Sequence, residues 1–150
     1  MPEVVQLPKL RAAVMRTTAS TEQLPSEFER IFPAVFAALT EQGVTDMGHV
    51  MAAYHTMDAN QMSLSAGIEI GDDVAVSAPL ELLEMPPCDA VKADHFGPYD
   101  TLYQTHESIW PFVQELGREP VAGPIERYIT DPEAEPDPSK WHTEILLPLQ

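Results

Sequence analysis

Basic residues are scarce in this chain. Eight Lys and Arg stand against 24 Asp and Glu, which gives a formal net charge of −16. A nucleic-acid-binding surface needs clustered cationic side chains that displace the counterions of the phosphate backbone. The sequence contains no such cluster, so we expect no binding to nucleic acid. The field of an acidic protein instead favours neutral or cationic partners.

Cysteine and long apolar runs are scarce too. The single cysteine, Cys88, excludes an internal disulfide and fits a reducing compartment, so we expect a cytoplasmic location. Cys88 has no histidine or second cysteine nearby, which favours a partly buried thiol over a catalytic one. No apolar run approaches the ~20 residues that span a bilayer, and the start of the chain, Met1-Pro2-Glu3, lacks the basic residues of a secretory signal. We therefore expect no membrane association.

The common patterns of metal, phosphate and nucleophile sites are missing as well. There is no glycine-rich phosphate loop and no G-x-S-x-G motif. The histidines have no spacing that suits a metal ion; they are His49, His55, His95, His106 and His142. We expect neither a metal nor a cofactor, and each histidine is better explained as a surface or core residue than as a ligand.

The sequence does contain an internal repeat. The matched segments are Ile31–Val35 with Ile109–Val113, Met51–Thr56 with Ile125–Thr130, and Ile68–Ile70 with Thr143–Ile145. We interpret residues 1–150 as a single domain, with a first repeat over about 4–70 and a second over about 82–149. Two such units commonly pack about a pseudo-twofold axis, and the seam between them is a natural place for a ligand cleft.

Each repeat is predicted to be a β-α-β-β unit. The first has a strand over 4–16 interrupted at Pro8, a helix over 26–42, and strands over 50–56 and 64–70. The second has a strand over about 82–94, a helix over 100–116, and strands over 124–130 and 141–147. A proline at the matched position of each helix, Pro33 and Pro111, predicts a kink in both. The fold class is therefore α+β, an antiparallel sheet with two kinked helices on one side and a central cleft.

The two helices are predicted from apolar stripes at helical spacing. The stripes are Phe28, Ile31, Phe32, Val35, Phe36 and Leu39 in the first helix and Leu102, His106, Ile109, Val113 and Leu116 in the second. Ser26 followed by Glu29 predicts a capping box, and Asp100 predicts a cap for the second helix. Gly43 and Gly117 stand where the two helices should end.

Alternation along the segment 125–129 gives the best candidate for a functional site. Glu126 and Tyr128 share one face of this strand, and Arg127 lies on the other. A desolvated carboxylate beside aromatic faces binds organic cations well. The alternative is that Glu126 lies on a solvated face, because glutamate is almost never fully buried without a partner.

The repeat extends this candidate site. It aligns Tyr54 with Tyr128 and Glu69 with Glu144. If this face lies at the seam, both tyrosines and one or more carboxylates surround one cavity.

Other aromatic residues stand near the start of the second helix. The turn Gly97-Pro98-Tyr99 either only leads into the helix or holds Tyr99 over the mouth of the pocket. Phe96, Tyr103 and Trp110 fit a core, but a cleft between helix and sheet would expose their edges.

Five segments in order resemble the GyrI-like effector-binding domain: 95–99 (HFGPY), 109–112 (IWPF), 123–128 (GPIERY), 131–132 (DP) and 143–149 (TEILLPL). This domain occurs behind the DNA-binding helices of AraC- and MerR-type regulators and also as a free-standing protein. The resemblance covers essentially the whole chain, and its specific part is the second half. It implies a duplicated β-α-β-β fold whose central cleft binds bulky hydrophobic, often cationic, molecules.

The resemblance also implies site residues. The acidic residue and the aromatic residue of the family's E-x-Y strand correspond to Glu126 and Tyr128, and the Gly-Pro-Tyr motif corresponds to residues 97–99. The first half departs from the family, because Thr17–Ser20 stands where many members carry a second motif of this kind. No DNA-binding segment precedes residue 4, so we expect that the chain by itself is not a DNA-binding regulator.

Three functions fit these observations. The first is a stand-alone effector-binding protein that holds bulky hydrophobic or cationic small molecules in a cleft between the repeats. The second is a hydrolase of electrophilic small molecules, with Glu126 as general base and Tyr128 or Tyr99 as its hydrogen-bonding partner. The third is an acidic interaction protein that acts on a gyrase-like partner, since the family takes its name from a gyrase inhibitor. The candidate ligand-binding residues are Glu126, Tyr128, Tyr99, Tyr54, Trp110, Phe96, Tyr103 and Glu144.

Overall fold

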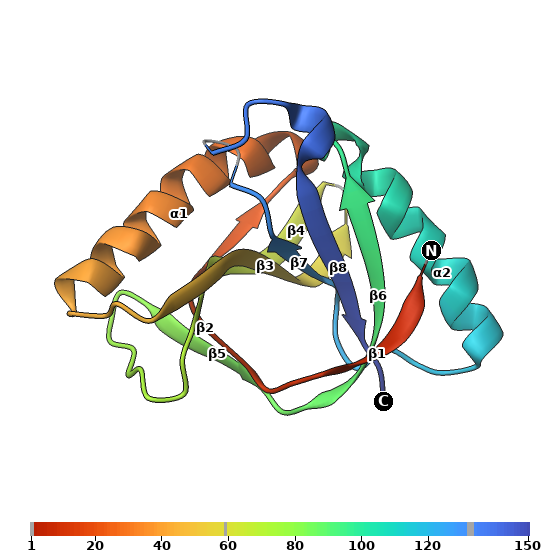
Figure 1. Cartoon of the computed structure of the whole chain (residues 1–150), viewed down its shortest axis with the longest axis horizontal. Helices are drawn as coiled ribbons and strands as arrows, with labels where there is room; N and C mark the ends of the chain where they lie inside the picture. The colour runs from red at the N-terminus through yellow and green to blue at the C-terminus, as the bar shows by residue number, and fades with distance from the viewer. Residues whose placement is uncertain (1, 59, 132–133) are drawn as a thin grey trace. The chain divides into compact units, whose positions relative to one another are not determined.

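The computed structural model describes residues 2–58, 60–131 and 134–150 (Figure 1). The chain divides into two compact units. Residues 8–87 form the N-terminal unit, and residues 1–7 together with 88–150 form the C-terminal unit. In the described ranges neither unit has a helix long and apolar enough to cross a membrane. Of the Asp131-Pro132 motif, Pro132 lies outside the described residues.

The N-terminal unit is a four-stranded antiparallel sheet with one long helix. Its elements are β2 (Leu10–Ala19), α1 (Leu24–Glu41), β3 (Met47–Asp58), β4 (Gln61–Ile70) and β5 (Glu81–Met85). The strands lie in the order β3-β4-β2-β5, and all neighbours are antiparallel. Helix α1 packs on β2 and β4 and buries Ile31, Val35 and Leu39 completely. These three side chains recur at helical spacing, so one apolar stripe faces the core.

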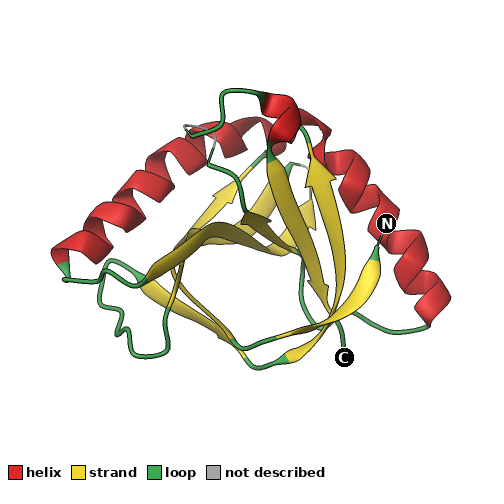
Figure 2. Cartoon of the chain, in the orientation of Figure 1, coloured by secondary structure: helices red, strands yellow, loops and turns green. Residues whose placement is uncertain are grey.

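The C-terminal unit likewise consists of four antiparallel strands and one long helix. Its elements are β1 (Glu3–Leu7), β6 (Cys88–Phe96), α2 (Leu102–Leu116), β7 (Ile125–Tyr128) and β8 (His142–Pro148). The strands lie in the order β1-β6-β8-β7, again antiparallel throughout. The core between α2 and the sheet is formed by Val91, Ala93, Leu102, Ile109, Val113, Ile145, Leu147 and Leu149. Both units therefore combine antiparallel strands with a helix (Figure 2), and the predicted α+β class with a duplicated β-α-β-β unit is confirmed.

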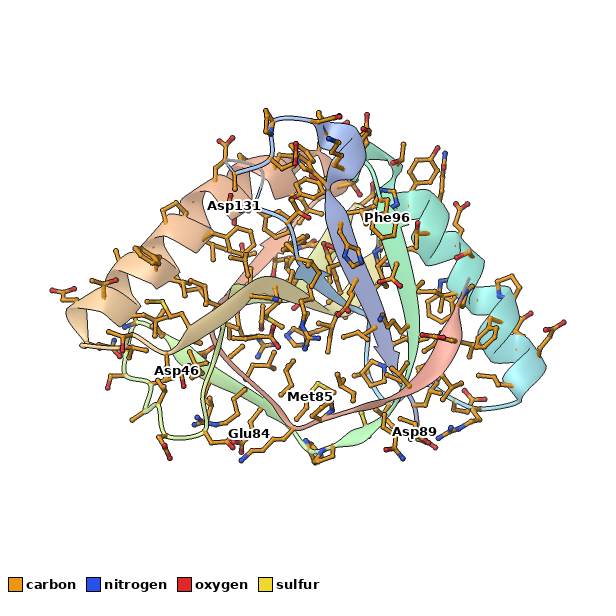
Figure 3. The ribbon with its side chains drawn as sticks, in the orientation of Figure 1. Asp46, Glu84, Met85, Asp89, Phe96 and Asp131 are labelled. Atoms are coloured by element: carbon orange, nitrogen blue, oxygen red, sulfur yellow. The ribbon has the colours of Figure 1, made fainter. Side chains whose placement is uncertain are left out.

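The two edge strands are exchanged between the repeats. The predicted strand over residues 4–16 is interrupted at Pro8, as expected, and its first part, β1, pairs with β6 of the C-terminal unit. In the same way β5, which carries Glu84 (Figure 3), pairs with β2 of the N-terminal unit. Arg11 on β2 binds Glu84 at 3.0 Å. Each β-α-β-β unit thus gains a fifth element from the segment that precedes the other repeat.

Both helices begin differently from the prediction. The expected capping box at Ser26 and the expected cap at Asp100 are wrong, because a 3-10 turn precedes each helix. At α1, the side chain of Gln23 accepts a hydrogen bond from the backbone N–H of Ser20 at 2.9 Å. At α2, the turn Tyr99–Thr101 comes first and the helix starts at Leu102.

The ends of the helices and most of the apolar stripes are as predicted. Gly43 and Gly117 follow the last turns with φ of 80° and 68°, the left-handed region that glycine adopts without strain. Phe36 and Leu116, at the outer side of the stripes, are 55% and 37% exposed instead of buried. Fewer residues of the predicted apolar stripes are therefore buried in the two cores than the sequence predicts.

Candidate functional site

Strand β7 turns a carboxylate toward the core of the C-terminal unit. Glu126 lies opposite Ile145 on β8, and Tyr128 lies opposite Thr143. Ile145 belongs to the core covered by α2, so the alternation of the strand brings Glu126 and Tyr128 to that same face. Glu126 is only 5% exposed. The alternative expectation, a glutamate on a solvated face, is wrong.

Both oxygens of the Glu126 carboxylate have close partners. The Tyr128 hydroxyl donates to Oε1 at 2.5 Å. The Nε2 atom of His106, on α2, lies 2.6 Å from Oε2. A buried carboxylate is costly unless hydrogen bonds replace its hydration. The tyrosine and the histidine supply these bonds and hold the carboxylate in a fixed position.

Two further aromatic rings border this pair. The Tyr99 ring lies 5.7 Å from that of Tyr128 in an edge-on arrangement and 5.1 Å from that of Trp141. Tyr99 is 38% exposed, so it lies at the surface end of the cluster. Its burial, followed by the charges of Asp131 and Glu126, raises the pKa of the Tyr99 hydroxyl, which therefore stays protonated. We call Glu126, Tyr128, His106, Tyr99 and Trp141 the Glu126 cluster.

A buried histidine fixes the turn that carries Tyr99. The Nδ1 atom of His95 lies 2.9 Å from the Thr105 hydroxyl, and Nε2 lies 3.0 Å from the Pro98 carbonyl oxygen. Gly97 in this turn has φ of 134°, a conformation that side chains oppose. The Gly-Pro-Tyr motif thus forms the turn before the helix and places Tyr99 beside Tyr128, whereas its position over the mouth of a pocket stays a prediction.

Glu144 lies away from the Glu126 cluster. It pairs in register with Arg127, so its side chain shares the opposite face of the sheet. There its carboxylate binds Arg127 at 3.1 Å and Lys92 at 3.5 Å. Phe96 (Figure 3) is 66% exposed, and its ring stacks on that of His142 at 4.4 Å. Both candidates therefore take part in other surface contacts of the unit.

Three other aromatic residues predicted to bind a ligand differ in burial: Tyr103 and Trp110 are exposed, and Tyr54 is buried. Tyr103 and Trp110, both on α2, are 58% and 46% exposed. Tyr54 lies on β3 of the N-terminal unit and is 4% exposed. The expectation that Phe96, Tyr103 and Trp110 fill the core is wrong, because all three are exposed and the core side of α2 is occupied by its aliphatic stripe.

Sequence reasoning missed two members of the Glu126 cluster. The apolar stripe correctly predicts His106 on the inner side of the second helix, but only as a core residue without a role. A polar residue on an otherwise aliphatic stripe was the available signal, because it needs a polar partner inside the fold. Trp141 stood at the start of a predicted strand and gave no comparable signal.

Thr143, next to this cluster, offers a stability test. It is fully buried, and its hydroxyl oxygen has no hydrogen-bond partner among the residues that the structure describes. Thr143→Val should raise the free energy of unfolding by about 1 kcal/mol, because an unsatisfied buried hydroxyl is replaced by a methyl group. Urea unfolding measures the change. Thr101→Val is the control and should destabilise, since the Thr101 hydroxyl donates to the Pro98 carbonyl at 2.9 Å. A loss of stability in Thr143→Val would contradict the prediction.

Comparison with known proteins identifies the family to which this chain is similar. A family model described as a GyrI-like small molecule binding domain matches residues 1–150. The crystal structure of the EcmrR C-terminal domain is similar, with a TM-score of 0.83 and 18% identity, over 100% of this chain and 97% of that chain. The cryo-EM structure of an EcmrR–DNA complex is similar with a TM-score of 0.86 and 20% identity, over 100% of this chain but 57% of that chain. The chain thus spans little more than half of the longer EcmrR chain.

Two further solved structures share the fold. SAV2435 bound to tetraphenylphosphonium has a TM-score of 0.71 at 14% identity, over 100% of this chain and 94% of that chain. A hydrolase from Listeria innocua has a TM-score of 0.64 at 14% identity, over 99% of this chain and 91% of that chain. No curated protein matches the chain in sequence. At these identities the likeness to the solved structures concerns the fold.

Proposed function

Since the chain belongs to the family of GyrI-like small-molecule-binding domains, we propose that it binds bulky hydrophobic cations and that Glu126 supplies the opposing charge. The observation that carries this proposal is a nearly fully buried carboxylate bordered by aromatic rings. SAV2435, which has the same fold, is described as bound to tetraphenylphosphonium, a cation of this class.

The chemistry of the Glu126 cluster suits such a ligand. An organic cation with a delocalised charge carries little hydration, so it enters an apolar site at low cost. The faces of Tyr99, Tyr128 and Trp141 offer negative π density, which attracts a cation, most strongly where water is excluded. The negative charge of the whole chain adds to this attraction at long range. Tyr99 borders solvent, and we propose that ligands approach past its ring.

The direct test is calorimetric titration with two probes of similar shape. Methyltriphenylphosphonium carries a positive charge, whereas triphenylphosphine oxide, with oxygen in place of the methyl group, is neutral. We expect the cation to bind at least about 10-fold more tightly, the effect of a charge-assisted contact of more than about 1.4 kcal/mol. Equal affinity of the two probes would show that hydrophobic contact alone drives binding, and would refute the role of the carboxylate.

A second candidate function is hydrolysis of electrophilic small molecules. It is favoured by the pairing of the Glu126 carboxylate with two groups that can carry a proton, the Tyr128 hydroxyl and His106 Nε2. Glu126 would take a proton from water as the water oxygen bonds to one epoxide carbon, and Tyr128 would protonate the oxygen released when the C–O bond of that carbon breaks. The proton on Glu126 would then return to Tyr128 through their hydrogen bond. A solved structure with the same fold is described as a hydrolase. Diol formation from styrene oxide, lost in Glu126→Gln, would support this function; no diol from the wild type would reject it for this substrate class.

We also propose that the chain alone does not bind duplex DNA. Its net charge of −16 repels the phosphate backbone, and six of its eight Lys and Arg already pair with carboxylates. A mobility-shift titration at physiological salt should show no complex. Binding at micromolar concentration would contradict this prediction.

A further inference from the structure

The N-terminal unit has a small cavity of its own. Its volume is about 260 Å³, and it is lined by Val14, Arg16, His55, Ser65, Glu81, Leu82 and Leu83. None of these residues belongs to the Glu126 cluster. The cavity is smaller than the roughly 300–1,000 Å³ of pockets for drug-sized ligands. The cavity therefore suits molecules smaller than the bulky cations proposed above.

The register of the sheet explains how the polar groups meet. Arg16 on β2 lies opposite Ser65 on β4, and Val14 on β2 lies opposite Glu81 on β5. Val14 and Arg16 are two positions apart on one strand, so all four side chains share one face of the sheet. Arg16 and Glu81 are then diagonal neighbours, with backbones roughly 7–8 Å apart.

The two charges in this cavity are both unpaired. Within residues 2–58, 60–131 and 134–150, Arg16 and Lys140 are the Lys and Arg residues without an ion-pair partner. Glu81 has no ion-pair or hydrogen-bond partner in these ranges either, so it does not reach Arg16. Both side chains are exposed to solvent, so each is free to pair with an opposite charge of a ligand that enters the cavity.

A histidine prepares one more polar group for the ligand. His55 Nε2 lies 2.8 Å from the hydroxyl of Ser65, which is 2% exposed. Partial burial of the ring, followed by the charge of Arg16, lowers the pKa of His55, so the imidazole is neutral near pH 7. In the tautomer with the proton on Nε2, His55 donates to the Ser65 oxygen. This leaves the Ser65 O–H as a donor for a ligand in the cavity.

We propose that this cavity binds a small zwitterion, an α-amino acid with a short apolar side chain. Its carboxylate accepts hydrogen bonds from the Arg16 guanidinium and the Ser65 hydroxyl, and its ammonium group binds Glu81. The apolar side chain contacts Val14 and the leucines of β5. Such a molecule pairs both free charges at once, which neither a simple anion nor a simple cation does.

The test is titration of the full chain with L-leucine by calorimetry, against two truncated analogues. 4-Methylpentanoate lacks the ammonium group, and 3-methylbutylamine lacks the carboxylate. We expect each analogue to bind at least about 10-fold more weakly, the loss of one charge-assisted hydrogen bond. Equal binding of 4-methylpentanoate would reduce the site to a carboxylate site and overturn the zwitterion, and no binding of L-leucine would overturn the proposal entirely.

Matched variants locate the binding. Arg16→Met and Glu81→Gln should each weaken L-leucine at least about 10-fold, with unchanged melting temperature and circular dichroism. Lys140→Met removes the other unpaired cation, far along the sequence, and should bind L-leucine as the wild type does. Wild-type affinity in Arg16→Met would overturn the site. Saturating tetraphenylphosphonium should leave L-leucine affinity unchanged, so that this site and the Glu126 cluster succeed or fail separately.

Discussion

Gly67→Ala should lower the free energy of unfolding by about 3 kcal/mol, the upper end of the usual cost of overpacking. Gly67 lies on β4 opposite Val14 of β2. A Cβ atom built on Gly67 would lie 1.8 Å from the carbonyl oxygen of Ala13 and 2.8 Å from its carbonyl carbon. These are backbone atoms of the neighbouring strand, so no side-chain rotation relieves the overlap. The two strands must separate, and the hydrogen bonds of the ladder weaken.

Gly48→Ala is the matched control for this prediction. Gly48 also lies on a strand of the same sheet, but there the added Cβ atom meets the Glu69 Cβ at an ordinary distance of 3.4 Å. We expect a change of less than about 1 kcal/mol, since alanine loses less backbone entropy than glycine and fits the space. Urea unfolding followed by circular dichroism measures both variants. Similar stabilities of the two variants would contradict the prediction.

Local periodicity was sufficient to predict the two helices and to place Glu126 and Tyr128 on one face of β7. The stripe positions Ile31, Val35 and Leu39 recur every three or four residues, and the structure buries all three. Glu126 and Tyr128 are two residues apart, so any strand puts them on one face. Such patterns depend only on the geometry of one element. They do not depend on what that element packs against.

Strand partners could not be predicted in the same way. The exchange of β1 and β5 between the repeats depends on contacts between distant segments, and alternation within a strand does not identify its neighbour. The same reason explains Glu144. The repeat aligned it with Glu69, but its register with Arg127 decides its face. One residue of difference in register moves a side chain to the other side of a sheet.

The hydrogen-bond partner of Glu126 on α2 could not be predicted from the sequence either. His106 is 20 positions away in sequence, on a different element, and only packing brings its Nε2 atom within 2.6 Å of the carboxylate. The resemblance to the family correctly favoured a buried Glu126. It did not predict the histidine, because the quoted motifs contain no residue between Tyr99 and Ile109.

Glu126→Gln should weaken the binding of tetraphenylphosphonium by about 1–3 kcal/mol, or roughly 5- to 150-fold, the scale of a lost charge-assisted contact. The amide keeps the shape of the side chain and an oxygen that accepts from the Tyr128 hydroxyl. The fold should therefore persist, as an unchanged circular dichroism spectrum would show. Only the negative charge disappears, so the affinity for neutral triphenylphosphine oxide should stay the same.

Glu144→Gln is the control that separates the local effect of the Glu126 charge from the effect of the net charge of the unit. Glu126 and Glu144 lie in the same sheet, and each substitution removes one negative charge. Glu144, however, faces away from the Glu126 cluster and is already compensated by Arg127 and Lys92. Its substitution should therefore leave tetraphenylphosphonium affinity nearly unchanged in the same calorimetric titration. An equal loss in both variants would mean that the cation senses only the overall field of an acidic protein, and that the Glu126 cluster is not its binding site.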